Sequence, residues 1–129
     1  MTGSQSKGVT KMTEEIVFAT PIVEGRIDDV RRFCEEMGAG ARAKEHDESR
    51  RRMGFRSVKV WVQRVRNKRA VLIAYWEAED IERVVREMAE SQDPFDVWFR
   101  EGVLEFHSVD LSQGTLRNPP EKFLDWQAD

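Results

Sequence analysis

The chain has 129 residues, of which 40% are hydrophobic and 35% are charged, and its net charge at pH 7 is -3. This length suits one domain of ordinary size with a single core. No apolar run approaches the roughly 20 residues of a membrane span, and an acidic balance argues against general nucleic-acid binding, because neutralising phosphates takes a basic surface. The single cysteine, Cys34, forms neither an intramolecular disulfide nor a zinc cluster, as is typical of the reducing cytoplasm.

The first elements are a leader, a strand and a helix. Residues 1–13 are small and polar, and we interpret them as a flexible leader. Glu15–Val23 is predicted to be a strand, since its apolar residues follow one another as they do in a strand buried on both faces. Pro21 marks an end or an edge of this strand. From Arg26 onward apolar residues recur at helical spacing, which predicts an amphipathic helix.

Residues 26–53 are predicted to form either one kinked helix or two consecutive helices, because Gly38 and Gly40 interrupt the pattern. The second half has few apolar residues and is expected to lie on the surface, and Gly54 suits a left-handed C-terminal cap. Basic residues crowd into positions 50–69, and such a patch is able to attract a phosphate or a carboxylate. We interpret them as solvated charges of a helix end and a hairpin turn.

A hairpin is predicted next, with strands over Ser57–Val65 and Ala70–Glu77 joined at Asn67-Lys68. Alternate residues of the first strand share a face: one face carries Val58, Val60 and Val62, and the other carries Lys59, Trp61 and Gln63. The second strand is apolar on both faces. It is therefore predicted to be the central strand of the sheet.

Two helices and a short strand are predicted after the hairpin. Glu79 and Asp80 stand at the start of the first helix, and Asp93 with Pro94 supplies the cap and first residue of the second. The residues that alternate with polar neighbours and predict the last strand are His107, Val109 and Leu111. The tail carries three large apolar residues, and we expect it to dock on its own domain or on a partner subunit. These residues are Phe123, Leu124 and Trp126.

The order of these elements is the β-α-β-β-α-β plan of ferredoxin-like domains, an α+β fold, with an extra short helix before the last strand. We assign residues 14–112 to this domain and residues 113–129 to a C-terminal extension. In this plan helices cover one face of a four-stranded antiparallel sheet. The other face would carry Trp61 and further apolar groups, more than a monomer leaves in water. We therefore expect a homodimer through the open sheet face, with an apolar cavity between or beneath the sheets.

The runs SQDPFDVWFREGVLEFHSVDLS and PPEKFLDW resemble those of a group of bacterial proteins of unknown function in the dimeric α+β barrel superfamily. The likeness spans roughly Glu15 to Trp126 and implies a ferredoxin-like domain that pairs into a barrel. The superfamily includes antibiotic-biosynthesis monooxygenases, haem-degrading enzymes, lactone isomerases and ligand-sensing domains, and the fold alone does not choose among them. Haem-degrading members use an asparagine, a tryptophan and a helix histidine. Trp76 matches the second, but residues 79–92 contain no histidine, which argues against that activity.

His107 is the best single candidate for a catalytic residue, since an imidazole in apolar surroundings has a pKa that can be tuned for proton transfer. A buried histidine bonded to Tyr75, Asp110 or a backbone carbonyl would satisfy the same pattern. Four aromatic residues are candidates for a ligand-binding pocket, with packing in the core and the dimer interface as the alternative. They are Trp61, Tyr75, Trp76 and Trp98.

No cofactor or metal is expected, because the chain has no phosphate loop, no nucleophile elbow and no histidine pair at metal spacing. His46, among acidic neighbours, is interpreted as part of a solvated helix face. We expect a soluble, cytoplasmic, dimeric protein that binds a small apolar molecule without assured catalysis. The alternative is a cofactor-independent, monooxygenase-like or isomerase-like enzyme that acts on an apolar aromatic substrate in a cavity beside the sheet. Neither nucleic acid nor a membrane is an expected partner.

Overall fold

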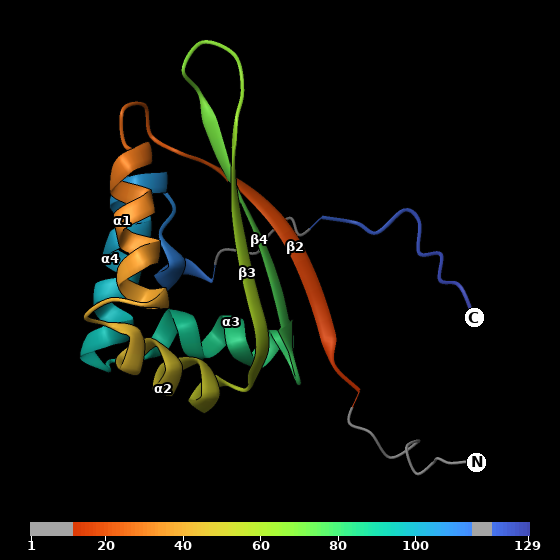
Figure 1. Ribbon diagram of the computed structural model, residues 1–129. Coiled ribbons are helices and arrows are strands. Elements are labelled where there is room, and N and C mark those ends of the chain that lie inside the picture. Colours follow the sequence, from red (N-terminus) through yellow and green to blue (C-terminus); the bar gives the residue numbers. More distant parts are fainter. Residues whose placement is uncertain (1–11, 115–119) are drawn as a thin grey trace.

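The computed structural model describes residues 12–114 and 120–129. Helices gather on one side of a small sheet, in an α+β architecture (Figure 1). In chain order the elements are β2 (Glu14–Pro21), α1 (Ile27–Gly38), α2 (Ala43–Met53), β3 (Phe55–Arg64), β4 (Ala70–Ala78), α3 (Ile81–Glu90), α4 (Pro94–His107) and the 3-10 turn η1 (Leu111–Gln113). Most of the predicted leader, residues 1–11, and residues 115–119 of the extension lie outside the described residues.

Within residues 12–114 and 120–129 the sheet has three antiparallel strands in the order β2-β4-β3, so the prediction of a central strand at β4 is confirmed. The hairpin turn is also where the sequence puts it. Asn67 and Lys68 have φ angles of 59° and 60°, and the Arg69 N–H donates to the Arg66 carbonyl at 3.2 Å. Two consecutive left-handed residues are the mark of a type I′ turn, whose twist matches that of the flanking strands.

The two faces of the sheet differ in what covers them. Ala74 and Trp76 of β4 are buried beneath the helices, at 3% and 7% exposure. Residues of the opposite parity point away from the helices, and no described element packs over them. On that open face Trp61 and Val17 are 52% and 48% exposed. In the strand register Ile73 of β4 lies beside Trp61 on β3 and Ala19 on β2, and Tyr75 lies beside Val17.

The residues between 26 and 53 form two separate helices, α1 and α2. Gly54 ends the second with a φ of 93°, as the left-handed cap predicted from the sequence. The expectation that this second helix lies on the surface holds for its outer side, where most of its residues are exposed, but Ser49, Arg50 and Met53 are buried. These three side chains lie on the helix face that meets α4 and the end of the sheet, and the charged residues around them hide that face in the sequence.

The start of each later helix is confirmed in detail. The side chain of Asp80 accepts a hydrogen bond from the Arg83 N–H at 3.1 Å, which caps α3. Asp93 caps α4 by accepting from the Phe95 N–H at 3.0 Å, and Pro94 occupies the first helical position. Each cap satisfies a backbone donor that has no partner within its own helix.

The last strand predicted at residues 107–111 does not form. His107 is the final residue of α4, Ser108 caps that helix with a φ of 58°, and a 3-10 turn follows from Leu111. The apolar stripe of α4 runs through Phe99 and Val103 at a spacing of four residues, and His107 continues it. A helix end followed by a loop thus produces the same alternation as a strand. The ferredoxin-like order is therefore not completed within the described residues.

Residues 120–129 contain no helix or strand and run past β2, away from the helices (Figure 1). The Lys122 ammonium lies 3.2 Å from a carboxylate oxygen of Glu15, which ties the tail to the first strand. The three apolar side chains of this segment lie in solvent. Phe123, Leu124 and Trp126 are 92%, 82% and 77% exposed.

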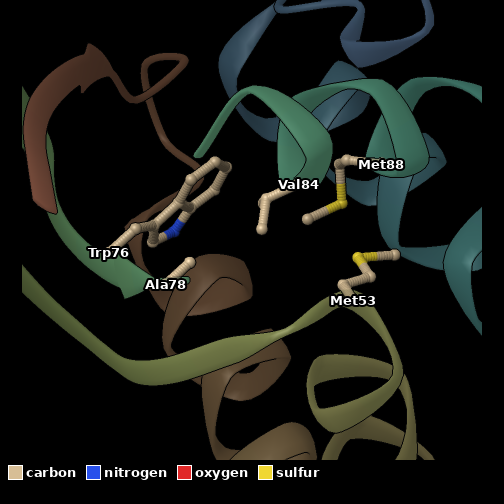
Figure 2. Close-up of a cluster of buried hydrophobic side chains, with 5 residues drawn as sticks. All are labelled: Met53, Trp76, Ala78, Val84 and Met88. Atoms are coloured by element: carbon tan, nitrogen blue, oxygen red, sulfur yellow. The ribbon is translucent and has the colours of Figure 1, made fainter. Parts of the chain in front are cut away.

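Buried apolar side chains form two clusters rather than the single core expected from the length. The larger contains Met53, Trp76, Ala78, Val84 and Met88. Figure 2 shows the side chains of Val84, Met88 and Met53 converging between α3 and the end of α2. The second cluster lies toward the other end of the sheet and contains Ile22, Val30 and Ala70. No helix among the described residues is long and apolar enough to cross a membrane.

Candidate ligand-binding pocket

A pocket of about 370 Å³ lies between the helix-covered face of the sheet and the helix layer. Leu72, Ala74 and Trp76 of the central strand line one side of it, and Phe99 and Val103 of α4 line the other. Both clusters reach it: Trp76 and Met88 belong to the larger one, while Leu72 and Cys34 pack against the smaller one. The pocket therefore separates the two parts of the core.

Arg50 is the most unusual polar residue of the pocket wall, because its side chain is charged yet only 7% exposed. Its guanidinium carbon lies 4.4 Å from the centre of the Phe99 ring, and the rings of Phe55 and Phe95 follow at 5.6 Å and 5.7 Å. Burial lowers the pKa of Arg50 to about 10, against the attraction of Asp96. Arg50 therefore carries its charge at neutral pH inside a cage of aromatic rings.

The hydrogen bonds of Arg50 leave most of its donors unused. Within the described residues its guanidinium donates once, from Nη1 to the Ser49 hydroxyl at 2.9 Å. Ser49 in turn donates to Asp96 at 2.6 Å, while Ser91 and Arg52 also donate to this carboxylate, Arg52 through two nitrogens at 2.9 Å and 3.1 Å. One of these bonds goes to Oδ1 of Asp96 and three go to Oδ2. Asp96 is thus bonded to Ser49, Ser91 and Arg52, and Arg50 makes no direct hydrogen bond to it.

His46 also lines the pocket and is half-buried, so the prediction of a solvated face is wrong for this residue. Its ring lies 6.1 Å from that of Phe95. Burial, assisted by the positive charge of Arg50 and opposed by Asp47, lowers the pKa of His46 to about 4. The imidazole is therefore neutral at pH 7.

His107 lies on the pocket wall at the end of α4 and is 6% exposed. Its Nδ1 lies 2.8 Å from the carbonyl oxygen of Pro21 and 3.4 Å from the hydroxyl of Thr20. A carbonyl only accepts, so the proton stands on Nδ1 and Nε2 keeps a free lone pair. Burial favours the neutral imidazole and lowers the pKa of His107, while the bond to Pro21 acts in the opposite direction. The bond joins the end of α4 to the end of β2.

The four aromatic residues predicted to share a pocket lie in three different places. Trp76 lines the pocket, with the rings of Phe18 and Phe55 edge-on at 4.9 Å and 5.3 Å. Trp61 and Tyr75 stand on the opposite face of the sheet, because they have the other parity along their strands. Trp98 lies in an outer groove between α1 and α4, beneath the Arg42 guanidinium at 4.0 Å.

Cys34 contributes an uncharged thiol to the pocket wall, since burial raises its pKa. No group of three or more His, Cys, Asp and Glu residues in the described parts of the chain is placed to hold a metal ion. The chemistry available in the pocket is therefore that of one cation, two neutral imidazoles, a thiol and a hydroxyl on apolar walls.

Among the lining residues that the sequence does not predict, Arg50 and His46 matter most for the chemistry of the pocket. The sequence does contain a pattern that indicates a buried helix face here: His46, Arg50 and Met53 recur at helical spacing on one face of α2. The signal is weak because only one of the three is apolar, and because arginine next to Arg51 and Arg52 is the usual composition of a solvated helix end.

Fold and site together define an α+β protein with a helix-covered antiparallel sheet of three strands and an apolar pocket beneath the helices. Comparison with protein-family models, with curated proteins and with solved structures finds no match to this chain.

Proposed function

We propose that the protein binds a small apolar molecule in the pocket between its sheet and its helices. The observation that supports this proposal is the division of the core by that pocket. A domain usually has one contiguous core, and small-molecule sites are mostly apolar and have about 300–1,000 Å³. A ligand with an apolar body would join the two clusters and cover Trp76 and Phe99.

The test uses 2-naphthalenemethanol, a neutral aromatic molecule, titrated into the protein by calorimetry. Ala74→Phe fills the pocket from the central strand, where Ala74 is 3% exposed. Ile73→Phe is the matched control, since Ile73 precedes Ala74 in the same strand and its side chain points to the open face. We expect binding to the wild type, a loss of at least about tenfold in Ala74→Phe, and no more than a twofold change in Ile73→Phe. An equal effect of both variants would contradict the proposal, and so would a wild type that binds neither this alcohol nor its acid analogue, 2-naphthoate.

We also propose that two copies pair through the open sheet face, as in the dimeric α+β barrel proteins that the sequence resembles. The support is the exposure of Trp61 and Val17 on a face that no described element covers, together with the exposed apolar tail beside it. Light scattering at micromolar concentration measures the mass. We expect a dimer for the wild type, a monomer for Trp61→Lys, and a dimer for Leu104→Lys, which alters an equally exposed residue on α4. A monomeric wild type would rule out this pairing.

A second candidate function is a cofactor-independent enzyme of the monooxygenase or isomerase type. The observation that favours it is the lone pair of His107 Nε2, on a residue of the pocket wall, held by the bond from Nδ1 to Pro21. A neutral imidazole so placed can take a proton from an activated C–H group of a bound substrate. The test follows deuterium exchange into 2-tetralone, an apolar aromatic ketone, by NMR. If the wild type catalyses this exchange faster than the His107→Gln variant, the protein is an enzyme. If the exchange rates are equal, the result supports a binding protein.

A further inference from the structure

We infer that the ligand of this pocket is a monoanionic carboxylic acid with an apolar or aromatic body, and that Arg50 binds its carboxylate. This inference rests on the proposed function, because it names the chemical class of the molecule that the pocket takes. It starts from a charge on the pocket wall that has no counter-charge in the pocket.

The charge balance of the wall is one-sided. Among the described residues that line the pocket, Arg50 is the one that is charged at pH 7: no aspartate, glutamate or lysine lines it, and both of its histidines are neutral there. A buried cation is stable only when it is paired or well hydrogen-bonded. An anion that enters the pocket would supply the missing partner.

The guanidinium is also held in place before any ligand arrives. The ring of Phe99 lies against it at 4.4 Å, and the bond from Nη1 to Ser49 fixes one of its nitrogens. Ser49 is fixed in turn by its 2.6 Å bond to Asp96, whose exposure is 0%. Little side-chain entropy remains to be lost on binding, so the remaining donors are pre-organised for an acceptor.

Asp96 does not serve as that acceptor. It accepts from Ser49, Ser91 and Arg52 but not directly from Arg50, and the charge of Arg52 already balances its own at 2.9 Å. Asp96 therefore orients Arg50 through the shared serine rather than neutralising it by direct contact. The free N–H groups of Arg50 stay available on the wall of the pocket.

The rest of the wall decides what kind of anion fits. Arginine presents parallel N–H groups that match both oxygens of a carboxylate. A phosphate monoester would bring a second negative charge that no other cation of the wall balances, at a high desolvation cost. Phe18, Phe33, Val103 and Leu72 then offer apolar surface to the body of the ligand.

The experiment compares 2-naphthoate with 2-naphthalenemethanol, which share one apolar body and differ in charge, by calorimetry at pH 7. The wild type is expected to bind the acid at least about tenfold more tightly than the alcohol. Arg50→Met keeps a long apolar side chain and removes the charge, so the preference for the acid is expected to disappear while alcohol binding changes less than twofold. Arg51→Met is the matched control, since the neighbouring guanidinium is 80% exposed and pairs with Asp47. It should leave both affinities unchanged.

Arg50→Lys provides the second variant, should the methionine variant not fold. It keeps the charge but loses the paired donors, so it should weaken the acid severalfold and leave the alcohol alone. If the wild type binds acid and alcohol equally and neither Arg50 variant alters that ratio, the inference fails while the pocket function stands. If the wild type binds neither molecule, the proposed function fails too.

Discussion

The hydroxyl of Ser49 lies 2.6 Å from Oδ1 of Asp96 and joins two helices that are separated by the whole β-hairpin and α3. Asp96 is completely buried, and it collects hydrogen bonds from α2 and from the loop before α4. The pair holds α2 against α4 and holds Arg50 at the pocket.

Replacement of Asp96 by Ala should lower the free energy of unfolding by about 2–4 kcal/mol, because it leaves the Ser49 and Ser91 hydroxyls and Arg52 without their acceptor. Urea denaturation measures the change. Asp47→Ala removes a carboxylate from an exposed pair with Arg51 on the same helix and should cost less than about 0.5 kcal/mol. Equal effects of the two substitutions would show that the buried network contributes no more to the free energy of unfolding than an exposed ion pair does.

Gly102 allows α4 to approach α1 closely. A Cβ at this position would lie 2.3 Å from Cε1 of Phe33, whose ring is packed against Trp98 and Phe99 at centroid distances of 4.7 Å and 5.7 Å. Gly102→Ala should therefore destabilise the protein by about 1–3 kcal/mol, despite the better helix propensity of alanine.

The matched variant is Gly38→Ala at the end of α1, where an added Cβ meets nothing within 4 Å. It should leave the melting temperature unchanged or raise it, since alanine gains up to about 1 kcal/mol over glycine in a helix. Thermal unfolding measures the melting temperatures of both variants against that of the wild type. A Gly102→Ala protein as stable as the wild type would mean that the two helices separate easily.

His46 should make the protein less stable as the pH falls. Its pKa is about 4 in the folded protein and near its ordinary value of 6.5 in the unfolded chain, so the unfolded chain binds the proton first. The free energy of unfolding therefore decreases as the pH falls from about 6.5 to about 4. His107, whose pKa is also lowered, acts in the same direction.

The difference in unfolding free energy between the wild type and His46→Gln isolates the first effect, because His107 and the carboxylates titrate in both proteins. This difference should shift against the wild type across that pH interval in urea denaturation. A constant difference would show that His46 is solvated in the folded state.

The hairpin turn offers a stabilising substitution. Lys68 holds a φ of 60°, which costs an L-residue about 1 kcal/mol that glycine does not lose, and Asn-Gly is the preferred pair of a type I′ turn. Lys68→Gly should raise the melting temperature, with a gain of up to about 1 kcal/mol. Arg66→Gly, one position before the turn centre and without a positive φ, should give no gain. A lower melting temperature for Lys68→Gly would contradict this account of the turn.

The sequence by itself determined the features that depend on neighbours along the chain. The strand alternation around Trp61, the turn at Asn67-Lys68 and the caps at Asp80 and Asp93 each rest on a few consecutive residues, and the structure has all of them. The central place of β4 followed from its two apolar faces.

Only the tertiary structure decided which of these residues meet. His107 ends a helix instead of starting a strand, and its Nδ1 bonds to the carbonyl of Pro21, which is 86 residues away in the chain. The predicted aromatic residues separate onto the two faces of the sheet and an outer groove, since the parity of each strand fixes its side. In the sequence Arg50 has the composition of a solvated helix end around it, which predicts an exposed charge. Two of the rings around it, those of Phe95 and Phe99, come from α4, far along the chain, and burial by distant residues leaves no local pattern.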